Sequence, residues 1–191
     1  MIARSRVVAA VLATLLVTVA AIAYRLSEPQ DAYEVVRAPL EQATAYGSGQ
    51  VRVSDVRVAT EVREGEERYR TDGLFVVVNV AVQASGRDAL GAASSQLLAQ
   101  GGVTYLPAFS LGASVRADPG FETARDLVYE VDPARIDDLT LELWDSGLVY
   151  RYYQRTRTPL GITARNARAW VEAGSGRSVV VVRDDVTRAL P

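Results

Sequence analysis

Carboxylates are the only side chains of this sequence that suit the common catalytic and metal-binding roles. The sequence holds no His and no Cys, and because all 21 basic residues are Arg it holds no Lys. Imidazole bases, thiolate nucleophiles, His or Cys zinc sites, lysine Schiff bases and lysine-containing phosphate loops are therefore excluded. What remains is a carboxylate pair for glycoside hydrolysis, or oxygen ligands for calcium.

The spacing of the carboxylates favours neither of these chemistries. Asp137 and Asp138 are adjacent, as are Asp184 and Asp185, and adjacent residues of a strand point to opposite faces and cannot flank one bond. The alternating Asp pattern of a helix–loop–helix calcium site is missing. We expect Asp126, with Glu122, to be solvated. The sequence therefore predicts no catalytic residues, no metal site and no cofactor, with a carboxylate-dependent cell-wall hydrolase as the alternative.

Charge is distributed unevenly along the chain. Residues 26–145 carry 10 Arg against 20 Asp and Glu, whereas residues 146–191 carry 8 Arg against 3 acidic residues. A strand is expected over 148–157, and its alternation places four residues on one side: Arg151, Tyr153, Arg155 and Arg157. This row is a candidate binding strip for an anionic polymer, lipid phosphates or an acidic envelope protein. Alternatively, the arginines fold back onto the acidic part of the domain or keep an edge strand soluble.

An unbroken apolar run covers Val7 to Ala23, with Arg4 and Arg6 before it and Arg25 after it. As a helix it would be roughly 26 Å long, slightly less than a hydrocarbon core of about 30 Å, and flanking arginines can close that gap by snorkelling. We therefore predict one N-terminal transmembrane helix that acts as a signal anchor.

The arginines before this run predict a single-pass cell-membrane protein whose C-terminal domain is extracytoplasmic, since positive flanks stay inside. A cleaved secretory signal ending near Ala21-Ile22-Ala23 is the alternative, and the domain would then be secreted. In either case nucleic acid is not expected as a partner, because the compartment is wrong and the exported part is net negative.

Three segments follow from these patterns: a cytoplasmic stub and anchor over 1–25, a juxtamembrane linker over 26–48, and a β-sandwich domain with basic C-terminal strands over 49–191. Pro29, Pro39 and the turn Gly47-Ser48-Gly49 indicate the linker. With no Cys for disulfides, the domain must be stabilised by its packed core.

Period-two alternation of apolar residues predicts seven or more short strands, hence an all-β sandwich. A β-bulge at Ser54-Asp55 would place the valines of 51–62 on one face, and Leu74–Gln83 is predicted as a central strand. Gly101-Gly102 marks a hairpin. A final hairpin is expected over 170–182, although Ala164–Ala173 also suits a short helix. Trp144 and Trp170 are expected to fill the core, and sugar stacking is the alternative.

Several segments resemble a known bacterial family: Gly73–Val80, Gly101–Tyr105 and Leu127–Val131. They are similar to a widespread extracytoplasmic domain of unknown function with an immunoglobulin-like, telokin-like sandwich, which is also similar to a secreted mycobacterial immunogenic protein. The similarity spans roughly Gly49 to Trp144. Where that family has an Asn before a turn, this chain has Gln83-Ala84-Ser85-Gly86. The resemblance implies an architecture and a location, and no catalytic residues.

Taken together, the sequence predicts a membrane-anchored module that binds or scaffolds another component of the bacterial cell envelope, without catalysis. Its expected contacts are the membrane, through the N-terminal helix, and an envelope protein or anionic polymer. A purely structural spacer is a further alternative.

Overall fold

The computed structural model describes residues 14–19, 33–108, 114–145, 153–175, 179–183 and 185–191. The chain divides into two compact units, Met1–Ala32 and Tyr33–Pro191. In the first unit the described residues 14–19 are helical, and the rest of the predicted anchor lies outside the described residues. Among all residues described, no helix is both long and apolar enough to span a bilayer.

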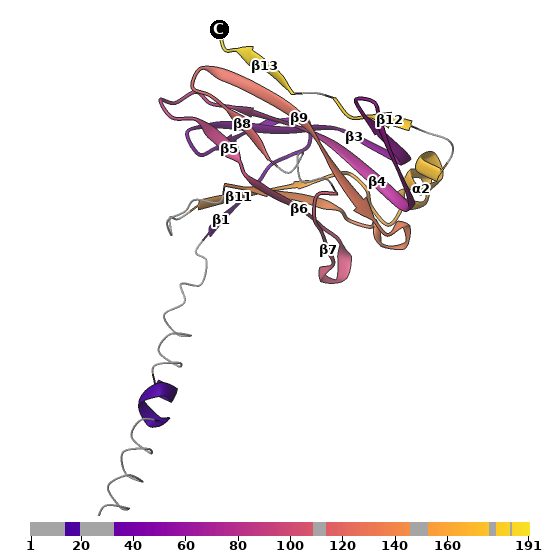
Figure 1. Cartoon of the computed structure of the whole chain (residues 1–191), viewed down its shortest axis with the longest axis horizontal. Coiled ribbons are helices and arrows are strands. Elements are labelled where there is room, and N and C mark those ends of the chain that lie inside the picture. The colour runs from indigo at the N-terminus through magenta and orange to yellow at the C-terminus, as the bar shows by residue number, and fades with distance from the viewer. Residues whose placement is uncertain (1–13, 20–32, 109–113, 146–152, 176–178, 184) are drawn as a thin grey trace, which may run out of the picture. The chain divides into compact units, whose positions relative to one another are not determined.

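The second unit is a β-sandwich, as the alternation predicts (Figure 1). The five-stranded sheet has the order β1 (Tyr33–Arg37), β11 (Tyr153–Pro159), β10 (Thr140–Trp144), β6 (Ser94–Leu98) and β7 (Thr104–Tyr105). The six-stranded sheet has the order β12 (Val179–Val181), β3 (Gly49–Glu64), β4 (Glu67–Gln83), β9 (Phe121–Val131) and β13 (Val186–Ala189), with β2 (Ala43–Tyr46) also paired to β3. The remaining elements are the pair β5 (Leu90–Ala92) and β8 (Val115–Ala117), the helix α2 (Ala167–Ser175), and two 3-10 turns, η1 (Gln100–Gly102) and η3 (Pro133–Arg135).

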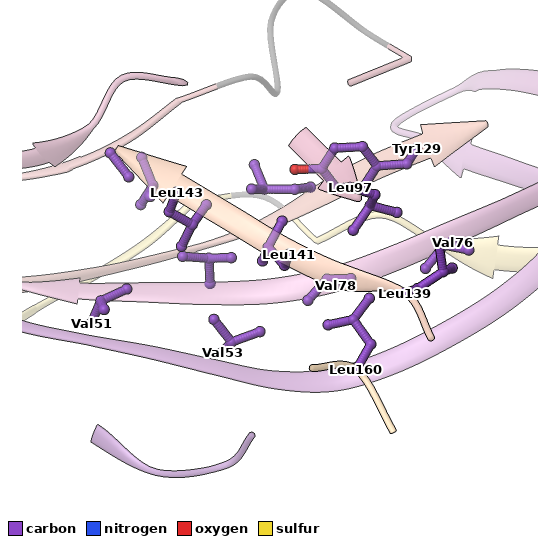
Figure 2. Close-up of a cluster of buried hydrophobic side chains, with 14 of the residues drawn as sticks. Val51, Val53, Val76, Val78, Leu97, Tyr129, Leu139, Leu141, Leu143 and Leu160 are labelled. Carbon is purple, nitrogen blue, oxygen red and sulfur yellow. The ribbon is translucent and has the colours of Figure 1, made fainter. Parts of the chain in front are cut away.

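The core lies between the two sheets and uses the predicted alternation (Figure 2). On β4 every second residue from Leu74 to Val82 is at most 1% exposed and belongs to this core. Leu141 and Leu143 of β10 face them from the five-stranded sheet and are equally buried. Burial of such side chains stabilises the fold by about 1.5–3 kcal/mol each, so the packed core takes the place of disulfides in a chain without Cys.

The predicted bulge in β3 is confirmed, because the β3–β4 register shifts between Ser54 and Arg57. Asp55 sits in the bulge with φ +49°. Val51, Val53 and Val58 face the core as expected. A second register shift, between Ala59 and Glu61, turns Val62 to the opposite face of the sheet, so the expectation that all five valines share one face is wrong.

Two other boundaries differ from the sequence prediction. Residues 33–46, expected in the linker, contain β1 and β2, and the compact unit begins at Tyr33 and not at residue 49. The expected final hairpin is wrong, whereas the alternative short helix is confirmed as α2. The hairpin at Gly101-Gly102 is confirmed between β6 and β7, and both glycines have positive φ.

The C-terminal segment, defined as residues 179–183 and 185–189 with the strands β12 and β13, connects opposite edges of the six-stranded sheet (Figure 1). β12 pairs in parallel with β3, whereas β13 pairs antiparallel with β9, and β4 lies between β3 and β9. Val182, 8% exposed, joins a second apolar cluster on the outer side of this sheet. The other buried members are Val62, Phe75, Val77 and Val128. The chain therefore covers this outer face with its own end.

Candidate functional site

In the part of the chain that the structure describes, each sheet buries one carboxylate on the face that points away from the core. Asp126 of β9 is 1% exposed and Glu142 of β10 is 0% exposed. Their neighbours Leu127 and Leu141 face the core, so alternation directs both carboxylates outward. The expectation that Asp126 is solvated is wrong. A buried carboxylate is costly unless it is paired, and the partners differ between the two sheets.

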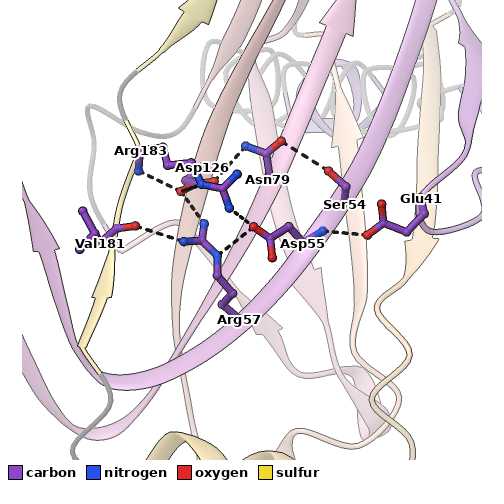
Figure 3. Close-up of polar contacts among 8 residues, drawn as sticks. All are labelled: Glu41, Ser54, Asp55, Arg57, Asn79, Asp126, Val181 and Arg183. Carbon is purple, nitrogen blue, oxygen red and sulfur yellow. Dashed lines mark hydrogen bonds and ion pairs between the residues drawn. The ribbon is translucent and has the colours of Figure 1, made fainter.

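Asp126 of β9 is held by donors from two strands, β3 and β4, and from the C-terminal segment (Figure 3). Its Oδ1 accepts a hydrogen bond of 2.9 Å from Asn79 Nδ2. Its Oδ2 accepts 2.5 Å from Arg57 Nη2 and 2.9 Å from the backbone N–H of Arg183. The guanidinium of Arg183 pairs with Asp55, the bulge residue. The bulge in β3 therefore supplies both an arginine and a second carboxylate to this group, which we call the Asp126 cluster.

The Asp126 cluster fastens the C-terminal segment to the sheet. Besides the bond from Arg183, Arg57 Nη1 donates 3.1 Å to the carbonyl of Val181. Further along, Arg125 pairs with Asp185, and this hydrogen bond raises the pKa of Arg125. Arg57, Asn79 and the backbone N–H of Arg183 thus satisfy Asp126 and hold the C-terminal segment against the sheet. This is the arrangement of a structural ion-pair network.

Glu142 is held within the five-stranded sheet itself. Its Oε2 accepts 2.6 Å from Gln96 Nε2 and 3.3 Å from Arg155 Nη1, and its Oε1 accepts 2.9 Å from Arg157 Nε. The register places Glu142 directly beside Gln96 on β6 and Arg157 on β11. These bonds need no residue from another part of the fold.

Arg155 lies against two aromatic rings on the same face. Its guanidinium carbon is 3.9 Å from the ring centroid of Tyr33 on β1 and 4.8 Å from that of Trp144 on β10. Both distances are within the range of cation–π contacts. The expectation that Trp144 fills the core is therefore wrong, whereas Trp170 of α2 does pack against it.

The predicted binding strip is only partly described. Arg151 lies outside the described residues, and of Tyr153 the structure describes the backbone, which pairs with Tyr33. Arg155 and Arg157 do share one face, and both pair with Glu142. β11 is flanked by β1 and β10, so the expected edge strand is wrong. A binding role for these arginines stays a prediction.

We call the outer side of the five-stranded sheet the open face. The β1–β11–β10–β6 register brings these residues onto it: Tyr33, Val35, Arg37, Gln96, Glu142, Trp144, Arg155 and Arg157. Val35 is 43% exposed and the Arg157 side chain 39% exposed. Outside this sheet, its strands have their most numerous contacts with β5 and β9. Figure 1 shows no described helix or strand of another sheet lying across the open face.

A separate shallow pocket of about 280 Å³ lies on the six-stranded sheet, lined by Thr60, Glu61, Arg70, Thr71 and Asp72. Glu61 is already paired with Arg70 at 2.6 Å and Arg68 at 3.6 Å. The described parts of the chain contain no group of three or more acidic side chains that could hold a metal ion.

Two core tyrosines have perturbed pKa values. Burial raises the pKa of Tyr129, and a hydrogen bond with Ser95 opposes that rise. Burial, followed by the charge of Asp145, raises the pKa of Tyr46, whose hydroxyl donates 3.2 Å to the carbonyl of Gly91. Both hydroxyls therefore stay protonated well above neutral pH, and both tyrosines are uncharged members of the core.

Comparison with known protein families and with curated proteins finds no match for this chain. Among solved structures, an uncharacterized β-sandwich protein from Clostridium difficile is similar at 7% identity and a TM-score of 0.44, covering 67% of this chain and 95% of that one. The yjhA protein from Bacillus subtilis is similar at 13% identity and a TM-score of 0.43, covering 80% of this chain and 98% of that one. Neither similarity carries information about function.

Proposed function

We propose that this chain is a single-pass, membrane-anchored extracytoplasmic module that binds or scaffolds another component of the cell envelope through the open face. The apolar run Val7–Ala23 is the proposed anchor, and the β-sandwich, of immunoglobulin-like type, is the exported part. The module has no catalytic role in this proposal.

One observation carries the proposal: the C-terminal segment covers one outer face of the sandwich, whereas the open face has no such cover among the described elements. The six-stranded sheet is covered by the C-terminal segment, which buries Val182 and is bonded to Asp126. The open face instead combines arginines, aromatic rings and the exposed Val35. Aromatic residues and Arg are enriched where proteins bind partners, so the open face is the better candidate for contact with a partner.

The test of location uses the full chain with a reporter fused after Pro191. We expect the protein in the membrane fraction, resistant to high salt and alkali, with the reporter active outside the cytoplasm. A protein recovered from the cytosol, or a reporter active only inside the cell, would contradict the anchor and the export together.

The test of binding is co-purification from cross-linked envelopes with two matched variants. Arg37→Gln with Arg157→Gln changes the open face, and Arg52→Gln with Arg188→Gln changes exposed arginines of the six-stranded sheet. Each pair removes the same charge. We expect the first pair to lose the partner and the second to keep it, whereas equal recovery would reject the open face as the binding surface.

A carboxylate-dependent wall hydrolase is the alternative with catalysis. Its most favourable site is the pocket beside Glu61 and Asp72. Release of soluble fragments from purified cell wall by the full chain, lost in Glu61→Gln with Asp72→Asn, would establish the hydrolase. If neither wall fragments nor a partner is found, the spacer alternative stands.

A further inference from the structure

We propose that the occupant of the open face is the anionic headgroup surface of the membrane that holds the N-terminal run, an inference that rests on the proposed function. Its first support is the connection between the two. Nine residues separate Ala23 from Tyr33, the first residue of β1 and a member of the open face. A fully extended chain of that length spans at most about 30 Å, so one edge of the open face is tethered near the bilayer.

The second support is the kind of side chain on this face. Tyr33 and Trp144 are half-buried around Arg155, and Val35 is 43% exposed beside them. Tyr and Trp are enriched at the membrane–water interface, where an aromatic ring meets both headgroups and acyl chains. An exposed valine between them adds apolar contact at the same level.

The third support is charge. Among its described residues, the open face carries Arg37, Arg155 and Arg157 against one carboxylate, Glu142, which leaves this set net positive. Residues 33–191 as a whole hold 18 Arg and 21 Asp and Glu, so the domain is net negative. An anionic surface therefore repels most of the domain and attracts this face, which selects one orientation.

Because the domain is tethered to the membrane, even a weak attraction between the open face and the headgroups is sufficient for docking. Because the domain is joined to the anchor by a short segment, docking is intramolecular and takes place at a high effective concentration. Arg157 and Arg37 can bind phosphate oxygens bidentately, while Arg155 stays against its two rings and Glu142 fixes the orientation of both β11 arginines.

The test uses the full chain in vesicles, labelled at one introduced cysteine, because the natural sequence has none. Val35→Cys reports from the open face, and Val186→Cys reports from the outer side of the six-stranded sheet. These valines are 43% and 42% exposed, which makes them a matched pair. Each carries the same fluorophore, and the vesicles contain a lipid with a nitroxide quencher on its headgroup, with either phosphatidylglycerol or phosphatidylcholine as the bulk lipid.

In phosphatidylglycerol vesicles we expect quenching at position 35 to exceed quenching at position 186 by about threefold or more, since the open face then lies within the headgroup layer. The difference should shrink in phosphatidylcholine, at high salt, and in the variant with Arg37→Gln and Arg157→Gln. The variant with Arg52→Gln and Arg188→Gln should retain it. Far-UV circular dichroism and thermal unfolding confirm that each variant is folded.

Equal quenching at the two positions in phosphatidylglycerol would overturn the proposal, and so would quenching that is independent of lipid charge. Protection of position 35 by a soluble anionic polysaccharide, without quenching by lipid, would assign the face to a wall polymer instead. Flotation of the labelled chain with the vesicles is measured in the same samples. Loss of flotation rejects the anchor and therefore the proposed function, whereas flotation without selective quenching rejects only the docking.

Discussion

The two outer faces of this sandwich differ in how a buried carboxylate is neutralised. Each buries one carboxylate and neutralises it with arginines. Asp126 takes its donors from β3, β4 and the C-terminal segment, so neutralising the charge also closes the face. Glu142 takes its donors from adjacent strands of its own sheet, so the face stays open. A buried ion pair can thus either fasten a covering segment to a sheet or stay within one sheet and leave its outer face accessible.

The largest loss of stability is expected when the Asp126 cluster is broken. Asp126→Ala leaves Arg57 and the backbone N–H of Arg183 without their shared acceptor. Removing one partner of a buried pair costs about 3–5 kcal/mol. Urea unfolding should show this loss, and hydrogen exchange should rise first in β12 and β13. A loss below about 1 kcal/mol, as for a surface pair, would mean that the Asp126 cluster does not hold the C-terminal segment.

Val182→Ser tests the apolar contact between the C-terminal segment and the six-stranded sheet. Val182 is 8% exposed over Phe75, Val77 and Val128, and burial of a valine is worth about 1.5–3 kcal/mol. We expect a destabilisation of about 1.5 kcal/mol and stronger binding of an apolar dye to the uncovered cluster. Val181→Ser is the control, because Val181 is 46% exposed and its replacement should change little.

The core shared by both faces predicts an alkaline limit of stability. Burial raises the pKa of Tyr46 and Tyr129 in the folded state. Their folded pKa values lie above the unfolded value of about 10, so their contribution is complete below pH 10 and is lost as the pH rises above it. Thermal unfolding at stepwise higher pH should show this decline, reduced in Tyr129→Phe. An unchanged slope in that variant would assign the decline to other groups.

The smallest effect on stability is expected at the rim of the open face. The side chain of Arg157 is 39% exposed, and Glu142 keeps its bonds from Arg155 and Gln96 when Arg157 is replaced. Arg157→Gln should therefore cost about 1 kcal/mol or less in urea unfolding, while weakening the docking described above. A loss similar to that of Asp126→Ala would make Arg157 part of the fold and unsuitable as a binding residue.

Alternation along single strands was sufficient to predict the sandwich. Leu74, Val76 and Val78 face the core as their spacing requires, and the bulge at Asp55 follows from a change of parity that is visible in the valines themselves. The position of β1 was not predictable, because five residues pairing in parallel with β11, more than a hundred positions later, leave no local signal. α2 illustrates the same limit, since Ala167–Ser175 suits two local structures and tertiary packing decides between them.

In the candidate site, too, features within one strand could be predicted from the sequence, whereas contacts between distant segments could not. Alternation alone places Arg155 and Arg157 on one face of a strand. Their shared partner Glu142 depends on which strand lies next to β11, and this is tertiary information. Asp126 was missed for a related reason: its partner Arg183 comes from a segment that crosses the sheet 57 positions later in the sequence.

The most direct measurement is photocross-linking in living cells with one photoreactive residue at position 35 or at position 186. The two positions are equally exposed, and each lies on a different outer face. The account predicts adducts with the membrane or another envelope component at position 35 and few at position 186. Equal labelling, or labelling that favours position 186, would contradict the claim that the chain closes one face of its sandwich and leaves the other for binding.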